Sequence, residues 1–483
     1  MLKNQMIVWL ASFSGAIPLL LSLSACVVGP SYQGPPATPL HDLHGAPAAV
    51  SVEPTATVPL DTWWLGFNDP ALTRIVERAV SQNLDLAAAA ARVDQARAAA
   101  REAGARLLPA GNVQTSVNQL HQSLTGPIGA IAHNLPGYYR DQRSYDVGVG
   151  AGWELDLFGG VKRGAEAAHD AAQAAQYEHM AVRVSVTAEA ADAYFQVRGD
   201  QARLLIARSQ VDNDTRLLEL IRLRLAKGAS SDKEVAQAEA LLAQARATLP
   251  PLDTALQAQL NRLDVLMGAQ PGTYAVELLQ PADIPTLPPL PTDQSASDLL
   301  RRRPDIAAAE RRLAASNAQI GVAVAEYYPK VSLAGLLGFD SLSAGRFFSA
   351  ASFEPQATAG LRWRLFDFGR VDAQVAQADS VHAQALLAYR QSVLRATEEV
   401  ENAFTSLAQL QIEIQELATE VGALRRARDK SQESYLAGAS SLTDVLDAER
   451  ELLESQDELA RARADSDRSA VASFRALGGG WKM

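Results

Sequence analysis

Histidine and serine side chains form no arrangement in this sequence that would support an enzymatic reaction. The seven histidines show no HExxH-like spacing, and no serine lies in a GxSxG turn. His121 and His133 fall in the loop region of a predicted hairpin, where we expect them to be solvated. The sequence therefore predicts a protein that is not an enzyme and that has no metal site and no cofactor.

Covalent chemistry is predicted at one position, Cys26, which is the only cysteine of the chain. A basic start at Lys3 and a short apolar run lead to Leu23-Ser24-Ala25, a pattern typical of an export signal rather than of a spanning helix. Leucine three residues before the cysteine resembles a lipobox, in which residues 1–25 are removed and the thiol is acylated, for instance with palmitate. Val27 favours sorting to the outer membrane. The alternative is a free thiol within an ordinary signal peptide.

A charged group near the C-terminus could act by closing an aperture. Asp444, Asp447 and Arg450 recur at a spacing of three and therefore lie on one face of a predicted helix. If several chains surround an axis, such faces form a ring of charge that could gate a channel. The simpler interpretation is an exposed ion pair worth about 0.2–0.5 kcal/mol. The first half of the chain has Glu234 and Gln237 where the second half has Asp444 and Asp447.

Composition excludes one class of partner and favours one class of architecture. The formal charge of −11 and the absence of a basic cluster with interleaved aromatic residues argue against nucleic acid. Hydrophobic residues make up 48% of the chain but aromatic residues only 6%. This alanine-rich composition favours long, closely packed helices over a single globular core.

The chain contains an internal repeat. Asp85–Ala89 matches Asp305–Ala309 at a shift of 220 residues, and after the predicted hairpins Trp153 matches Trp363 at a shift of 210. The first hairpin is therefore ten residues longer. We predict this division: a signal peptide at 1–25, a Pro- and Gly-rich lipid-anchored tether at 26–60, a first repeat at 61–280, a Pro-rich linker at 281–294 and a second repeat at 295–483.

Each repeat contains a segment in which the hydrophobic period is two, at about 110–157 and about 330–367. These segments predict two strands each, with one apolar face and with Trp153, Phe158, Trp363 and Phe368 at the membrane edge. A hairpin half-buried on a soluble core is the alternative. Four strands cannot close a barrel of about eight, the smallest common size, so membrane strands would require several copies. Three copies would supply twelve strands. The predicted apolar face comprises Val113, Thr115, Val117, Tyr145, Val147, Val149, Ala151 and Leu155 with Val331, Leu333, Leu337, Phe339, Ala357, Ala359, Leu361 and Leu365.

Long coiled-coil helices follow each pair of strands, at about 163–268 and about 370–477. The second has apolar heptad columns, whereas Asp200 and Asp214 interrupt a column of the first. Each long helix turns at a Gly-Ala-Ser-Ser sequence and returns as a shorter helix. We expect the returning helix to stack end to end with the helix that precedes the strands, and Pro250-Pro251 to break or kink the first returning helix.

These segments resemble the outer-membrane efflux channels, the TolC-like lipoproteins of the NodT and OprM type. The resemblance rests on Trp63-Trp64 to Leu72, Arg302–Ile306 with Ala309-Glu310, Pro329, Tyr435–Arg450 and Ala476–Trp481. It implies a mainly α fold with a β part: a homotrimer with a twelve-stranded barrel in the outer membrane of a Gram-negative bacterium, continued by a helical barrel in the periplasm.

The resemblance also implies a function. Such channels are passive exit ducts of drug pumps that confer antibiotic resistance, docked to a periplasmic adaptor and an inner-membrane transporter of the resistance-nodulation-division type. In the Leu446–Arg450 pattern, Asp447 and Arg450 would line the periplasmic aperture. The turns at Gly228, Ser230, Gly438 and Ser440 are predicted to dock the adaptor. The alternatives are a lipid-anchored periplasmic scaffold or adaptor, and an exit channel for protein secretion.

Overall fold

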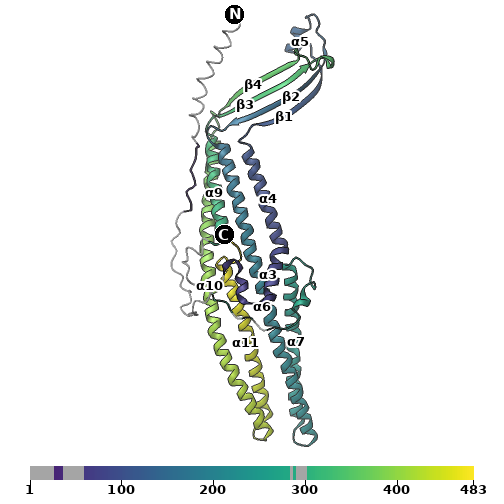
Figure 1. Ribbon diagram of the computed structural model, residues 1–483, viewed down its shortest axis with the longest axis vertical. Helices are drawn as coiled ribbons and strands as arrows, with labels where there is room; N and C mark the ends of the chain where they lie inside the picture. Colours follow the sequence, from purple (N-terminus) through teal and green to yellow (C-terminus); the bar gives the residue numbers. More distant parts are fainter. Residues whose placement is uncertain (1–26, 36–58, 283–284, 286, 290–301, 483) are drawn as a thin grey trace. The chain divides into compact units, whose positions relative to one another are not determined.

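The structure is a computed structural model that describes residues 27–35, 59–282, 285, 287–289 and 302–482 (Figure 1). Cys26 and the tether beyond Pro35 lie outside the described residues. Contacts divide the chain into two compact units. The sheet unit contains 27–35, Asp94–Ala174 and Glu310–Ala388, and the helical unit contains the other described residues. Each unit contains segments of both repeats, so the compact units do not coincide with the repeats.

The sheet unit contains a four-stranded antiparallel sheet in the order β1-β2-β3-β4 (Figure 1). The strands are β1 (Ala110–His121), β2 (Asp141–Leu155), β3 (Lys330–Ser341) and β4 (Phe353–Arg362). The longer first connection contains α5 (Pro127–Ala132), and the second contains the short helix η3 (Ala344–Arg346). The two predicted strands per repeat are confirmed. Because β4 ends at Arg362, the predicted strand residues beyond it lie outside the sheet.

Strand register places the predicted apolar residues on one face. Val149 lies opposite Val113 on β1 and opposite Leu337 on β3, and Trp153 lies opposite Leu333. Side chains of successive strand residues point to opposite faces, so the other face carries mainly glycine and polar residues, with Leu120 and Leu336 as exceptions. Val113, Val149 and Leu337 are all more than half exposed in the single chain. The sheet thus presents an apolar surface that the described residues of one chain do not cover.

The first described residues, 27–35, pack against the other segments of the sheet unit. The Val28 N–H donates to the Phe158 carbonyl at 3.1 Å, and Arg163, which is buried, donates from Nη2 to the Ser31 hydroxyl at 3.1 Å. Gly29 has a φ of +84°, and a Cβ there would lie 2.5 Å from the Cα of Gly321. The start of the predicted tether is therefore held in place by a close backbone contact that only glycine allows.

The helices contributing to both units are α4 (Leu84–Ala105), α6 (Gly160–Ala226), α9 (Pro304–Ala325) and α10 (Arg370–Leu436). The helical unit adds η1 (Leu60–Phe67), α3 (Pro70–Gln82), α7 (Asp232–Leu266), η2 (Ala275–Leu278) and α11 (Leu442–Ala476). None of the described helices combines the length and the apolar character that crossing a membrane requires. The largest core cluster of the helical unit includes Trp63, which stacks on Phe474 with ring centroids 5.2 Å apart.

Short helices meet end to end at two equivalent joints. The buried Asn83 amide donates to the last-turn carbonyl of α7, Leu266 O, at 2.9 Å. At the equivalent position, shifted by 220, Arg303 donates from Nη1 to Ala476 O of α11 at 3.1 Å and forms an ion pair with Glu399 at 2.7 Å. Each joint satisfies a helix-end carbonyl that would otherwise lack a partner. The predicted end-to-end stacking is confirmed.

The two consecutive prolines do not end the returning helix. Pro250 and Pro251 lie inside α7, which continues to Leu266, so the prediction of a break is wrong. The helix persists because it packs against α6: Leu252 is buried in a cluster with Leu204 and Ala207. Tertiary packing of this kind outweighs the hydrogen bonds that the prolines remove.

Candidate functional site

The two helix-hairpin turns of the helical unit are built in the same way. Gly228 has a φ of +71° and Gly438 a φ of +76°, so each occupies the left-handed position that favours glycine after a helix. The N–H of Ala229 donates to Arg224 O, and that of Ala439 donates to Ser434 O, at 2.8 and 2.9 Å. These contacts close the α6 and α10 ends as Schellman turns.

A capping box begins each returning helix. Ser231 and Glu234 form it at α7, and Ser441 and Asp444 form it at α11, where the Ser441 N–H donates to Asp444 Oδ2 at 2.9 Å. The Ser230 hydroxyl and the Ser231 N–H lower the pKa of Glu234. Asp444, predicted as a gate residue, therefore has the same local role as Glu234: its carboxylate binds the N-terminus of its own helix.

The remaining predicted gate residues form an exposed ion pair. Arg450 Nη2 lies 3.2 Å from Asp447 Oδ1 across one turn of α11, with the two side chains 49% and 52% exposed. Arg450 also lines a cavity of about 380 Å³ between α6, α7 and α11. Both groups can thus reach other molecules while they pair with each other.

Behind the turns, Tyr435 joins the two helical hairpins. The ring is buried in a cluster with Leu217, Ile221 and Leu442, and the Arg224 guanidinium lies 4.6 Å from its centroid. Burial, and then the Glu234 carboxylate, raise the pKa of Tyr435. Sequence reasoning used this tyrosine only as part of a family pattern. The signal that the sequence analysis did not use was an aromatic residue in the last turn of α10, three residues before Gly438.

A buried polar network crosses the seam between α6 and α11. Gln210 Nε2 donates to Asp214 Oδ1 at 2.8 Å and to Glu449 Oε2 at 3.5 Å, and Arg428 on α10 donates to Glu449 Oε1 at 3.0 Å. Asp214 is 2% exposed, and its Oδ2 has no hydrogen-bond partner among the described residues. Burial, with a smaller contribution from Glu449, raises the pKa of Asp214 to about 7. The interruption of the heptad column is therefore a polar contact between hairpins.

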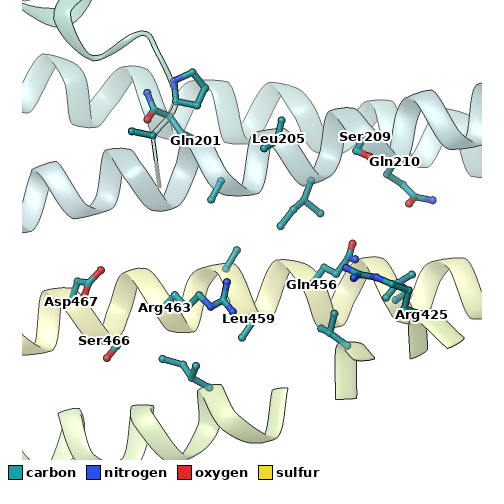
Figure 2. Close-up of a pocket in the computed structure, with 18 of the residues that line it drawn as sticks. Gln201, Leu205, Ser209, Gln210, Arg425, Gln456, Leu459, Arg463, Ser466 and Asp467 are labelled. Carbon is teal, nitrogen blue, oxygen red and sulfur yellow. The ribbon is translucent and has the colours of Figure 1, made fainter. Parts of the chain in front are cut away.

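A larger cavity, of about 1030 Å³, lies beside this network (Figure 2). It is bounded by α6, α10, α11 and the described part of the linker, including Pro281 and Pro285. Asp467 extends from α11 toward α6 in Figure 2; it is 2% exposed, and its Oδ2 has no partner among the described residues. Burial raises the pKa of Asp467 to about 8. In the described part of the chain, no cluster of three His, Cys, Asp or Glu residues could hold a metal ion.

The predicted membrane-edge aromatics lie in the sheet unit. Trp153 Nε1 donates to Leu107 O at 2.9 Å, and Trp363 Nε1 donates to Tyr327 O at 3.0 Å, so the two repeats use equivalent contacts. Phe158 stacks on Tyr328. Phe368 is fully exposed and has a φ of +54°, unusual for a residue with a side chain.

Comparison with known proteins identifies the family. The family model described as "Outer membrane efflux protein" matches residues 75–269 and 296–479, which make up most of both predicted repeats. The chain belongs to this family. It is 33% identical to the pyoverdine export outer membrane protein OpmQ of Pseudomonas putida, with 96% of this chain and 97% of that protein covered. It is 29% identical to the solvent efflux pump outer membrane protein SrpC of Pseudomonas putida, with 96% and 97% covered.

Among solved structures, the outer-membrane channel OprN is 34% identical and has a TM-score of 0.86, with 94% of this chain and 100% of that chain covered. The predicted resemblance, the outer-membrane location and the mainly α fold with a β part are confirmed. The protein is the outer-membrane channel of an efflux system, and the family is one of transport proteins.

The buried carboxyl of Asp467 predicts that stability depends on pH. Its pKa is about 8 in the folded chain and near 3.8 otherwise, so between these values the folded state holds a proton that the unfolded state has lost. Stability therefore falls as the pH rises from about 4 to about 8. We expect Asp467→Asn to raise the melting temperature at pH 9, and to raise it clearly less at pH 5.5, where less than half of the loss has occurred.

Thermal unfolding in one detergent at both pH values measures this effect. Asp212→Asn, at an exposed position of α6, is the matched control and should change neither value. If Asp467→Asn changed the melting temperature equally at the two pH values, the raised pKa of Asp467 would not be the cause, and the prediction would be contradicted.

Proposed function

We propose that three copies of the chain close a twelve-stranded barrel and form a passive exit duct for small molecules. The observation that carries this proposal is the sheet itself: β1 and β4 are its edges, and its apolar face is exposed. In hydrocarbon each unpaired backbone group costs several kcal/mol, so an open four-stranded sheet cannot stand alone. Four strands from each of three chains exceed the minimum of about eight for a closed barrel.

The duct depends on partners that supply energy. A chain without a catalytic residue arrangement cannot drive transport, so we propose an inner-membrane transporter of the resistance-nodulation-division type and a periplasmic adaptor. Relatives named for export of pyoverdine and of solvents support small molecules as the transported class. We also propose acylation of Cys26, on the strength of the lipobox alone; the intact mass of the mature protein tests it.

The proposed gate consists of Asp447 and Arg450. Three copies would bring three of these half-exposed ion pairs toward one axis, where pairing between chains would hold the aperture closed. The first repeat has an uncharged residue, Gln237, in place of Asp447, so the two hairpins of a chain are unequal. Asp444 supports this gate indirectly, since it caps the helix that carries the pair.

Removing the pair tests the gate. We expect the double variant Asp447→Ala, Arg450→Ala to conduct more in planar lipid bilayers than the unmodified protein, because the charges that hold the aperture closed are gone. The matched control is Lys430→Ala, Glu433→Ala, which removes another exposed pair of the same spacing at 2.7 Å. If the gate variant and the control show the conductance of the unmodified channel, the gate lies elsewhere.

The exposed turns are the proposed adaptor contacts. Gly228 and Gly438 lie at the tips, with Ser230 and Ser440 one residue before the capping serines. A photo-crosslinking residue at Ser230 or Ser440 should capture the adaptor in cells in which the pump is assembled. The same residue at Glu420, an exposed position of α10 that precedes the turn at Gly438 by 18 residues, is the control. Capture at Glu420 but at neither turn would contradict docking through the tips.

A further inference from the structure

The large cavity of the helical unit is lined by a buried carboxyl that no described residue satisfies. The cavity measures about 1030 Å³ and is bounded by α6, α10, α11 and the described part of the linker (Figure 2). Asp467 of α11 is 2% exposed, and its Oδ2 atom has no hydrogen-bond partner among the described residues. Folded proteins rarely leave a buried polar group unpaired, so this atom indicates a missing partner.

The surroundings of Asp467 determine its charge state. Neither α6 nor the described part of the linker contributes a charged side chain to the cavity. Besides Asp467, the charged residues that α10 and α11 contribute are Arg425, Arg428, Glu449 and Arg463. Burial raises the pKa of Asp467 to about 8. At pH 7 the carboxyl is therefore mostly protonated, and it can donate a hydrogen bond to a bound molecule.

Two arginines of the cavity have no acidic partner among the described residues. The guanidinium of Arg428 is engaged, because it pairs with Glu449 at 3.0 Å. Arg425 and Arg463 are exposed and form no ion pair with any residue that the structure describes. A guanidinium presents its N–H groups in a planar fork that fits a carboxylate. Two such groups at one cavity, in a chain with a formal charge of −11, favour an anionic ligand.

Arg463 and Asp467 lie on one face of α11. Their spacing of four residues places the two Cβ atoms about 5–6 Å apart. Figure 2 shows Asp467 extending toward α6, with Arg463 next to it along α11. The apolar residues Leu452 and Leu459 of the same helix also line the cavity. One small molecule can therefore contact a cation, a hydrogen-bond donor and an apolar surface at the same time.

We propose that this cavity binds a small organic anion with an apolar body. The carboxylate of the ligand accepts hydrogen bonds from the Arg463 guanidinium, and another of its oxygen atoms accepts one from the protonated Asp467. The apolar body contacts Leu452 and Leu459. Every residue of this site belongs to one chain, so the inference does not rest on the proposed barrel or duct.

The balance of charge argues against other classes of ligand. When Asp467 is protonated, three arginines of the lining face the single carboxylate of Glu449. An organic cation would have to ionise the buried carboxyl and would leave Arg463 without a partner. An uncharged apolar molecule would leave both Asp467 and Arg463 without one, and unpaired buried polar groups cost free energy.

Fluorine NMR of the full-length protein in lipid nanodiscs tests the site. The probe is p-trifluoromethylbenzoate, and p-trifluoromethylbenzamide is the uncharged probe of the same shape. We expect the benzoate to bind about tenfold more tightly than the benzamide, and Arg463→Gln to remove this difference, because a hydrogen bond to a charged group is lost. The control is Arg461→Gln, which removes an exposed arginine of α11 that does not line the cavity.

The pH dependence of binding tests the contact with Asp467. The benzoate should bind about tenfold more weakly at pH 9 than at pH 7, because Asp467 loses its proton near pH 8 and its carboxylate then repels the anion. Asp467→Asn keeps an uncharged donor at this position. We expect this variant to bind the benzoate at both pH values as tightly as the unmodified protein does at pH 7. Asp467→Ala should bind it weakly at both.

Each contradictory result has a distinct meaning. Equal affinity for the benzoate and the benzamide, or unchanged affinity in Arg463→Gln, overturns the assignment of an anion site. A tenfold loss between pH 7 and pH 9 that persists in Asp467→Asn overturns the role of Asp467, because another group then titrates. A protein that conducts in planar bilayers but binds neither probe overturns the site and leaves the proposed duct in place.

Discussion

A sheet with two open edges is the constraint on which the other features of this chain depend. The four strands pair in sequence order, and the backbone groups on the outer sides of β1 and β4 have no strand partner in the described residues. The exposed apolar face allows the sheet to enter hydrocarbon, and hydrocarbon in turn requires that every backbone group be paired. Both requirements are met when copies of the chain continue the sheet until it closes.

The internal duplication makes that closure possible with one kind of chain. Both hairpins use the same register, and both Trp153 and Trp363 hold their hairpins by the same hydrogen bond. The helical unit repeats its parts in the same way, with Asn83 and Arg303 closing equivalent joints. The departures from the repeat are local. The first hairpin carries α5 in its longer connection, and the buried Asp214 of α6 contacts α11 through Gln210.

Local patterns predicted most of this fold because its elements are long and regular. The period of two predicted the strands and their apolar face, and heptads and Gly-Ala-Ser-Ser turns predicted the helical hairpins. The summed lengths of the two short helices, which nearly match the long helix, predicted their end-to-end stacking. The missed features are contacts between residues far apart in the chain. A local pattern could have singled out Tyr435, but none predicts that its ring contacts Arg224, or that Arg163 donates a hydrogen bond to Ser31.

In the candidate site, too, residues with a local sequence pattern were predicted, and contacts between distant parts of the chain were not. Spacing alone placed Asp447 beside Arg450, and the structure pairs them. The same spacing included Asp444, but the capping box with Ser441 engages that carboxylate, a contact that the Ser-x-x-Asp pattern could have revealed. The unpartnered Asp467 could not be recognised from sequence, because its burial depends on how α11 packs near α6.

Hydrogen exchange of the strand amides in lipid nanodiscs tests the central claim most directly. If copies of the chain close the sheet, backbone amides of β1 and β4 are as fully hydrogen-bonded as those of β2 and β3. All four strands should then exchange on the same slow timescale, read at peptide level by mass spectrometry. Exchange of β1 and β4 that is much faster than that of β2 and β3 would show open edges and would contradict the account.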